Sequence, residues 1–526
     1  MDDSPYITTY CDYLQSSGLT AEMNAGSQIA HILEQTQWDE PQTSLDCNNY
    51  AVVALIEAEN SEDPTTRELY LDMAIAALEQ GNDHPLCKAH WILIKSLLGE
   101  REEALNAGFS AFLSLLQPVY SSAFNSQDAM PAGLIYLPQV WQGQGEPSSS
   151  RLNEMLHLQS SDQQALLLLG EILNQSQLVF YNSIGLRFLH LAATLFPQSA
   201  SIMHALGISN LVNGRWEGLL YLQRADQQQP NCSSILQSLY LAYKDLQQPQ
   251  LSLSWLNTAQ TAADQNPDSS AWQWAKLEDD SPFTYVTVEK DGLLAVEPSF
   301  KSIVTSVLLV QGRWFEQEME FWRDRIQPGM TVIDVGANVG VYTISAARRV
   351  GATGRVVAIE PFSNCVQYLQ ETCRVNGLDW VTVCRGAASD RDGMIRLALH
   401  GASELNEVIT TEEELEPGTY EEAPCFSLDT LVEQENLHRV DVLKIDAEGH
   451  ELQVLKGSDR LLKEMAPVIM YENVAGSQGS NLPVAEYVVS RGYQLFRYMP
   501  YLKQLIPVDS HSDLKNSLNI IALPRS

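Results

Sequence analysis

Basic residues are scarce in this chain. Its 526 residues include 32 Lys and Arg against 66 Asp and Glu, which gives a formal net charge of -34. The shortage runs along the whole chain: 10 basic residues against 32 acidic ones stand before residue 281, and 22 against 34 follow. Because such a protein repels phosphate backbones and anionic lipid surfaces, we expect neither nucleic acid nor a membrane surface as a general partner.

Long apolar runs and paired cysteines are also missing. No stretch of about 18 apolar residues is present to form a membrane-spanning helix. The amino terminus, MDDSPYITTYCDYLQSSG, lacks the basic start and apolar run of a signal peptide. The 8 cysteines include no C-x-x-C pair, which fits reduced thiols better than a zinc site or a disulfide framework. Together these absences predict a cytoplasmic protein.

Helical periodicity dominates residues 1–280. Apolar residues recur there at intervals of three and four, as on one face of an α-helix. QGQGEPSSS, from Gln142 to Ser150, is typical of a linker, so we expect a helical domain over residues 1–145. The segments with this periodicity are AVVALIEAEN, RELYLDMAIAALEQGN, KAHWILIKSLLGE and EEALNAGFSAFLSLLQP.

Residues 146–280 contain a weak internal repeat. Leu169-Gly170 and Leu206-Gly207 lie 37 residues apart, and prolines close successive units at Pro197, Pro230 and Pro267. Small residues let the two helices of a hairpin approach closely, and proline ends the second helix. Hairpins of roughly 34–37 residues resemble tetratricopeptide repeats, whose stacked helices present a concave surface to a protein partner or a long acceptor. The alternative is an irregular helical bundle.

Strands and helices alternate after residue 280. SPFTYVTVEKDGLLAVEPS has the alternation of strands, and SVLLVQGRWFEQEMEFWRDRIQPGM then predicts a helix that ends at Pro328-Gly329. Alternation of this kind predicts a parallel sheet covered by helices over residues 281–526. The predicted strands are TVIDVG, RVVAIEP, VTVCRGAAS, VDVLKIDAEG and APVIMYE.

The turn after the first of these strands indicates a nucleoside ligand. Asp334, Gly336 and Gly340 form a D-x-G-x-x-x-G pattern rather than G-x-G-x-x-G. A dinucleotide pyrophosphate needs bare backbone N–H groups, and a carboxylate at Asp334 would repel it. The same carboxylate suits the ammonium and positive sulfur of S-adenosylmethionine. Glu360 ends the second strand, 20 residues past Gly340, where a carboxylate can accept both ribose hydroxyls.

In order, DVGANVGVYT, AIEP, LKIDAEGHELQVLKG and NIIALP resemble the FkbM-type methyltransferases, a branch of the class I S-adenosylmethionine-dependent enzymes. GRWFE, residues 312–316, resembles the helix before the family's core. The resemblance implies a Rossmann-like, seven-stranded sheet whose last strands form a hairpin. It implies O-methylation, often of a sugar hydroxyl in glycans, glycolipids or secondary metabolites. Carried over by position, it implies that Asp334, Gly336, Asn338 and Gly340 line the methionine end, that Glu360 holds the ribose, and that Asp390 holds the adenine amino group.

Ionisable residues gather at the end of VDVLKID, which the class I order makes the fourth strand. Methyl transfer to a hydroxyl needs a general base, which contributes about 10²–10⁴-fold. We expect Asp446 and His450 to be the base and its orienting partner, in either order. Lys444 shares a face with Asp446 and can pair with it. Glu448 and Glu472 are expected to bind the acceptor, and Glu451 to cap a helix.

Three further expectations concern the whole chain. The spacing of the acidic residues is not diagnostic of a metal, so none is expected. ITTEEELEPGTYEEAP, residues 409–424, predicts a loop over the acceptor cleft; a solvated acidic surface is the alternative. A helical-repeat region followed by a class I methyltransferase domain is the expected fold. Two rival functions are an interaction protein whose cofactor-binding domain does not turn over, and a methyltransferase that acts on a docked protein.

Overall fold

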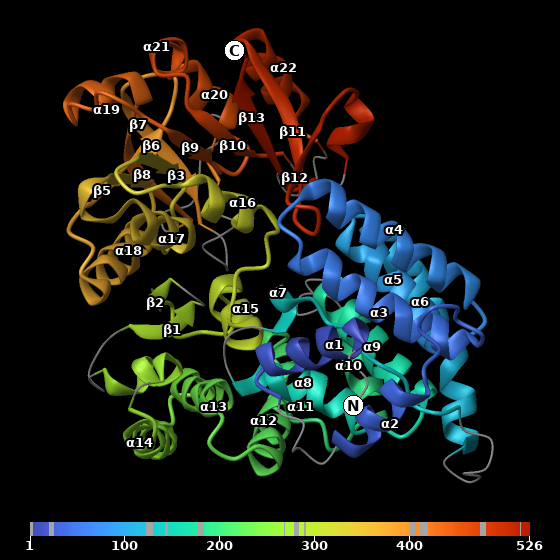
Figure 1. Cartoon of the computed structure of the whole chain (residues 1–526). Coiled ribbons are helices and arrows are strands. Elements are labelled where there is room, and N and C mark those ends of the chain that lie inside the picture. Colours follow the sequence, from blue (N-terminus) through green and yellow to red (C-terminus); the bar gives the residue numbers. More distant parts are fainter. Residues whose placement is uncertain are drawn as a thin grey trace. The chain divides into compact units, whose positions relative to one another are not determined.

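Two compact units make up the chain, Met1–Leu239 and Tyr240–Ser526 (Figure 1). The three-part division expected from the sequence, 1–145, 146–280 and 281–526, stays a prediction. The computed structural model describes residues 4–19, 26–122, 130–142, 146–176, 183–267, 269–277, 283–288, 291–399, 407–409, 419–473, 480–515 and 517–525.

The first unit is helical throughout its described elements, as the periodicity predicts. None of its described helices, nor any in the second unit, is long and apolar enough to cross a membrane. The predicted linker at residues 142–150 is wrong in part: α8 already begins at Glu146, and residues 143–145 lie outside the described part. The helices are α1 (Pro5–Ser16), α2 (Gly26–Gln35), α3 (Ser44–Asn60), α4 (Pro64–Gln80), α5 (Pro85–Leu97), α6 (Arg101–Ser122), α7 (Gln139–Gln142), α8 (Glu146–Leu156), α9 (Ser161–Ser176), α10 (Ser183–Leu195), α11 (Ala200–Val212) and α12 (Gly218–Gln228), followed by α13 (Ser233–Asp245), which crosses into the second unit.

Close helix packing is visible between α11 and α12. A Cβ atom at Gly207 would lie 2.7 Å from the Leu222 side chain, and one at Gly218 would overlap the main-chain oxygen of Gly207. Gly170, the other glycine of the sequence repeat, has open space around it. The three prolines follow α10, α12 and α14 by two residues each, as predicted. Helical hairpins are therefore present, and their assignment to tetratricopeptide repeats stays a prediction.

The second unit continues from α13 with two helical elements, a β-hairpin and two further helices before the main sheet. The single helix predicted over residues 306–330 is wrong, because it is interrupted at residues 312–317. Gly312, with φ of +69°, caps α15 in the left-handed conformation, and GRWFE is an extended loop rather than a helix. The elements are α14 (Pro249–Gln265), η2 (Ser270–Lys276), β1 (Thr284–Val288), β2 (Gly292–Val296), α15 (Ile303–Gln311) and α16 (Glu318–Arg325).

An eight-stranded sheet forms the centre of the second unit, in the order β12-β11-β13-β10-β9-β3-β4-β5. The strands β10, β9, β3, β4 and β5 are parallel, and β13 runs antiparallel between β10 and β11. The predicted seven strands are present, and β12 adds an eighth at one edge. Their bounds are β3 (Thr331–Val335), β4 (Arg355–Glu360), β5 (Val381–Arg385), β9 (Val442–Ile445), β10 (Val468–Glu472), β11 (Tyr493–Met499), β12 (Gln504–Pro507) and β13 (Asn519–Pro524).

Apolar side chains of this sheet form a buried core with the neighbouring helices, including Ile333, Leu443, Val454 and Val484. The segment GHELQVLKGSDRLL, residues 449–462, has the apolar pattern of one helix, but Gly457 separates α20 from α21. A Cβ atom at Gly457 would overlap the main-chain oxygen of Ser389. The helical elements here are α17 (Val341–Val350), η3 (Gly351–Thr353), α18 (Ser363–Asn376), α19 (Leu428–Gln434), α20 (Glu451–Lys456), α21 (Asp459–Glu464), α22 (Leu482–Ser490) and η5 (His511–Leu514).

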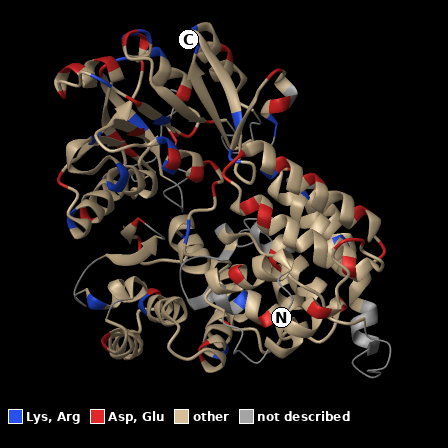
Figure 2. Ribbon diagram, in the orientation of Figure 1, with Lys and Arg blue, Asp and Glu red and all other residues tan. Residues whose placement is uncertain are grey.

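A small second sheet of β6 (Ala387–Ala388), β8 (Tyr420–Phe426) and β7 (Gly393–Ala398) follows β5 in the chain. The strand predicted as VTVCRGAAS is split by Gly386, which has a φ of +154°. Part of the predicted acidic loop is wrong, because residues 420–424 belong to β8; residues 410–418 of that loop lie outside the described residues. Acidic side chains are distributed over both units (Figure 2).

Candidate active site

The carboxyl ends of the parallel strands bring most of the predicted site residues to one edge of the sheet. Glu360 ends β4, the glycine turn follows β3, Asp446 follows β9, and Glu472 ends β10. In the sheet these strands stand in the order β4, β3, β9, β10. Ligands of such sheets bind beyond the carboxyl ends of the strands.

The glycine turn is in direct contact with the end of β9. Gly336 has a φ of +74°, and a Cβ atom there would overlap the main-chain oxygen of Asp446. The Asp446 N–H donates to the Val335 carbonyl over 3.1 Å. Asn338 is also left-handed, with φ of +49°, and Gly340 at +103° caps α17. The turn therefore packs backbone against backbone at Gly336.

Glu360 closes this turn from the next strand. Its Oε2 accepts the Asn338 N–H over 2.8 Å, and its Oε1 accepts the Phe362 N–H over 2.9 Å. Burial raises the pKa of Glu360 to about 7, although these two N–H donors act in the opposite direction. Each oxygen keeps a second lone pair, so the side chain can still accept a hydroxyl.

Asp334 is fully buried in β3 beside this turn. Thr343 donates its hydroxyl to Oδ2 over 2.6 Å, while Oδ1 is buried with no hydrogen-bond partner among the described residues. A buried acceptor without a donor costs about 1–3 kcal/mol, so this oxygen favours a donor from a ligand. An ammonium group would satisfy both the hydrogen bond and the charge.

Lys444 lies across from Asp334 in the sheet, because the two residues are register partners in β3 and β9. Only 2% of its side chain is exposed, and its Nζ donates to Asp446 Oδ2 over 2.8 Å. Nζ also lies 4.5 Å from the centre of the Tyr342 ring. Burial alone would lower the pKa of Lys444, but the charges of Asp446, Asp334 and Glu316 outweigh burial and raise it. The predicted pairing of Lys444 with Asp446 is present.

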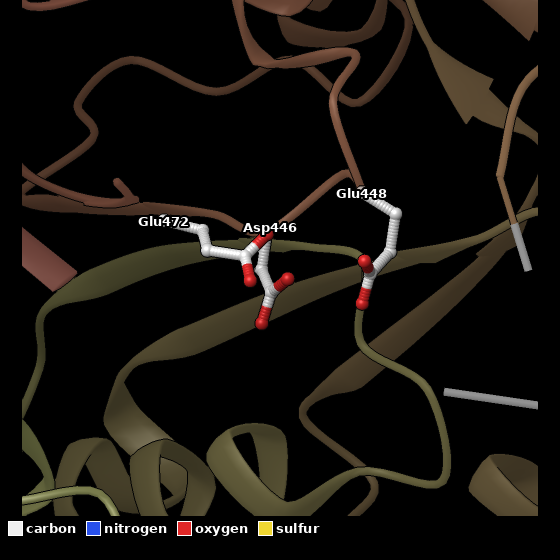
Figure 3. Close-up of side chains that lie close together, drawn as sticks. All are labelled: Asp446, Glu448 and Glu472. Carbon is white, nitrogen blue, oxygen red and sulfur yellow. The ribbon is translucent and has the colours of Figure 1, made fainter. Parts of the chain in front are cut away.

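The Asp446 carboxylate of this pair also lies close to two further carboxylates. Asp446, Glu448 and Glu472 each place an oxygen within 4.8 Å of the others, and Figure 3 shows the three groups directed to one space. Burial and then the charges of Asp446 and Glu451 raise the pKa of Glu448 to about 8. Burial and then the charges of Asp446 and Glu448 raise the pKa of Glu472 to about 10. Oxygens with this spacing can share protons, bind hydroxyls or hold a divalent cation.

His450 lies in a different set of contacts from Asp446. Its Nε2 is 3.0 Å from the Ser389 hydroxyl, which also contacts Asp390 over 3.4 Å. Among the described residues no hydrogen bond joins His450 to Asp446. Burial lowers the pKa of His450. Asp390 itself is exposed.

In place of the expected helix cap, Glu451, the first residue of α20, binds the loop that precedes the helix. Its Oε1 accepts the N–H groups of Ala447 and Gly449, each over 3.0 Å, and its Oε2 accepts from Asn481 over 3.0 Å. These bonds fix the loop in which Glu448 has a φ of +47°. A left-handed glutamate is uncommon, so the loop imposes the direction of the Glu448 side chain.

Sequence reasoning missed Glu316 and Tyr342, which complete the surroundings of Lys444. The Tyr342 hydroxyl donates to Glu316 Oε2 over 2.5 Å. Glu316 is half-buried, and desolvation of its carboxyl raises its pKa. The segment GRWFE combines two aromatic residues with one acid and could have indicated these contacts. They were not predicted because the segment was expected to be a helix.

Residues 334–495 match the family model described as the methyltransferase FkbM domain. No curated protein matches the chain. Among solved structures, an FkbM methyltransferase from Methylobacillus flagellatus KT is 17% identical with a TM-score of 0.26, over 42% of this chain and 53% of that one. An S-adenosylmethionine-dependent O-methyltransferase from Thermotoga maritima is 15% identical, with a TM-score of 0.26, over 46% and 77%. An O-methyltransferase from Bacillus cereus, in complex with S-adenosylhomocysteine, is 18% identical, with a TM-score of 0.23, over 40% and 80%.

The chain thus spans about half the length of the first of these structures. With TM-scores this low, the match to the family model and the strand order are the two findings that bear on function.

Proposed function

We propose that the chain, whose residues 334–495 match the FkbM methyltransferase domain, transfers a methyl group from S-adenosylmethionine to a hydroxyl of a sugar, glycan or secondary metabolite. The observation that carries this proposal is the group of Asp446, Glu448 and Glu472 beside the glycine turn. Carboxylates at this place can orient a hydroxyl and accept its proton.

The donor half of the site fits a cationic nucleoside. When bound, S-adenosylmethionine supplies a methyl group on a positively charged sulfur. Asp334 offers its unpartnered Oδ1 to the ammonium group, and the turn at Gly336, Asn338 and Gly340 would line the methionine end. Glu360 would accept from the ribose. Asp390, exposed next to Ser389, would hold the adenine amino group.

The acceptor half removes the hydroxyl proton. We propose Asp446 as the base, because Lys444 fixes its carboxylate and about a quarter of its side chain, 27%, remains exposed to a ligand. His450 then supports the site through Ser389 rather than through Asp446. Glu448 and Glu472 would hold the remaining hydroxyls of the acceptor. With pKa values raised to about 8 and about 10, they are largely protonated at neutral pH and can donate as well as accept.

The test is the transfer of labelled methyl from S-adenosylmethionine into a fractionated extract of the host cell. Asp446→Asn should lower transfer by about 10²-fold or more while donor binding is kept, because the amide cannot take a proton. Asp379→Asn is the matched control, since Asp379 is exposed just before β5, at the opposite edge of the sheet. Label in a glycan or small-molecule fraction, lost only in the Asp446 variant, is the expected result.

Other outcomes would redirect the proposal. Label found only in protein would favour a docked protein acceptor, with the helical unit as the binding surface for that partner. Donor binding without label in any fraction would favour an interaction protein. Transfer lost in a chelator and restored by a divalent ion would place a metal at the three carboxylates.

A further inference from the structure

The loop between α15 and α16, residues 312–317, carries an aromatic pair that the donor site does not use. Trp314 and Phe315 are both half-buried, and their ring centroids lie 4.7 Å apart at an angle of 57°. Adjacent aromatic residues on a loop would usually be buried in the core or scattered on the surface. Both side chains are therefore partly accessible to a ligand.

Glu316 anchors this loop to the sheet. Its Oε1 accepts the indole N–H of Trp314 over 2.8 Å. Its Oε2 accepts the Tyr342 hydroxyl over 2.5 Å and the side-chain amide of Asn519 over 2.7 Å. Glu316 is half-buried and accepts from three donors, so the indole of Trp314 is held at its polar end.

The anchor also places the loop along the edge of the sheet. Asn519 begins β13 and is the register partner of Glu472 at the end of β10. Passing from β4 to β13, the edge presents Glu360, then Asp334 and the turn, then Lys444 with Asp446, then Glu472, and then Asn519 with Glu316. Trp314 is therefore linked through Glu316 to Asn519, the register partner of Glu472 at the end of β10.

We propose that Trp314 and Phe315 form an acceptor subsite that packs against the C–H face of a neutral sugar ring, while Glu448 and Glu472 bind its hydroxyls; this rests on the proposed methyl transfer to a sugar hydroxyl. A pyranose has an apolar face and a polar rim, and an aromatic wall beside carboxyl groups matches both. The surplus of carboxylates over Lys444 in this site favours a neutral ring over an anionic one.

The experiment compares full-length wild type with Trp314→Ala and Trp314→Phe. The probes are methyl glycosides of neutral hexoses and 6-deoxyhexoses, with labelled methyl transfer as one readout. Direct binding of the same glycosides, by saturation-transfer NMR in the presence of S-adenosylhomocysteine, is the other. Trp216→Ala is the control, because Trp216 is 54% exposed in the helical unit.

Trp314→Ala should raise the KM for the best glycoside by about three- to tenfold, as expected for the loss of one aromatic contact, with the Kd of the donor unchanged. Trp314→Phe keeps a ring but loses the N–H bond to Glu316, so its KM should rise less than that of Trp314→Ala. An unchanged KM in Trp314→Ala, or an equal loss in Trp314→Phe, would overturn the subsite.

The two readouts separate the subsite from the proposed function. Transfer that does not depend on Trp314 would overturn the subsite alone. Glycoside binding that depends on Trp314, without any transfer, would support the subsite and overturn sugar methylation. If no glycoside is bound or methylated while the donor binds, both are overturned.

Discussion

Gly336 is the residue at which the glycine turn contacts the end of β9, where the candidate base Asp446 lies. Gly336→Ala should destabilise the second unit and abolish donor binding, because the added Cβ would overlap the Asp446 carbonyl and the residue has a φ of +74°. We expect a loss of several kcal/mol in the free energy of unfolding, as for other strained, overpacked sites. Thermal unfolding and calorimetric titration with S-adenosylhomocysteine would measure the two effects.

Gly377→Ala separates strain from collision. Gly377 follows α18 in the left-handed conformation, with φ of +63° and ψ of +42°, and nothing lies within 4 Å of its added Cβ. It should therefore lose only about 1 kcal/mol, the usual cost of a left-handed alanine, and keep full donor binding. Equal losses in the two variants would contradict the close contact at Gly336.

Glu448 should make the stability of the folded protein depend on pH. Its pKa is raised to about 8 in the folded protein, above that of an unfolded glutamate. Its contribution to stability is therefore present at acidic pH and is lost as the pH rises towards 8. Gln cannot ionise. The free energy of unfolding of Glu448→Gln should therefore increase relative to that of wild type by about 1 kcal/mol or more between pH 5 and pH 9.

Denaturant unfolding at several pH values would measure this gain. Glu464→Gln on α21 is the control, because Glu464 is exposed. If the stability difference between Glu448→Gln and wild type stayed constant with pH, Glu448 would not be in the protonated cluster described above.

At the residue scale, the sequence predicted contacts that depend on local geometry. Lys444 and Asp446 share a face because strand residues alternate, and their pairing followed from that alone. The bond between His450 and Ser389 joins residues 61 positions apart, through the approach of α20 to β6. No local rule specifies such a contact, and the same holds for Glu316 with Asn519.

At the scale of elements, the packing of α11 on α12 is testable with a matched pair of glycines. Gly207→Ala should destabilise the helical unit by about 1–3 kcal/mol, because its Cβ would press on Leu222 at 2.7 Å. Gly170→Ala in α9 meets open space and should stabilise by up to about 1 kcal/mol through helix propensity. Chemical denaturation of both variants would check the two signs. Similar effects at both positions would contradict the hairpin packing.

Elements were predicted well where periodicity is long and uniform. The four helices α3–α6 and the parallel strands follow from their apolar spacing. Interruptions were missed where one glycine acts through a distant contact or a special backbone angle. Gly386 divides β5 from β6, Gly312 ends α15, and Gly457 separates two short helices where Ser389 approaches. The apolar pattern continues through all three positions, so periodicity alone predicts one continuous element where the structure has two.

At the scale of the whole molecule, the net charge of -34 should make stability depend on salt. Like charges repel in the compact state more than in the unfolded chain, and added salt screens them. The melting temperature should therefore rise between 20 and 200 mM NaCl at pH 7. The corresponding increase in the free energy of unfolding should be on the order of 1 kcal/mol. KCl at the same ionic strength should give the same rise. A fall in the melting temperature would mean that attractive ion pairs outweigh the general repulsion.

The position of β13 in the sheet has a consequence for biosynthesis. This strand lies between β10 and β11, and its first residue, Asn519, holds the anchor Glu316 from 203 positions earlier in the chain. During translation the ribosome must therefore pass residue 524 before the centre of the sheet can close. The helical unit is complete hundreds of codons earlier and can fold while the rest is still being made. A nascent chain would thus display a finished helical unit long before it could carry out any chemistry.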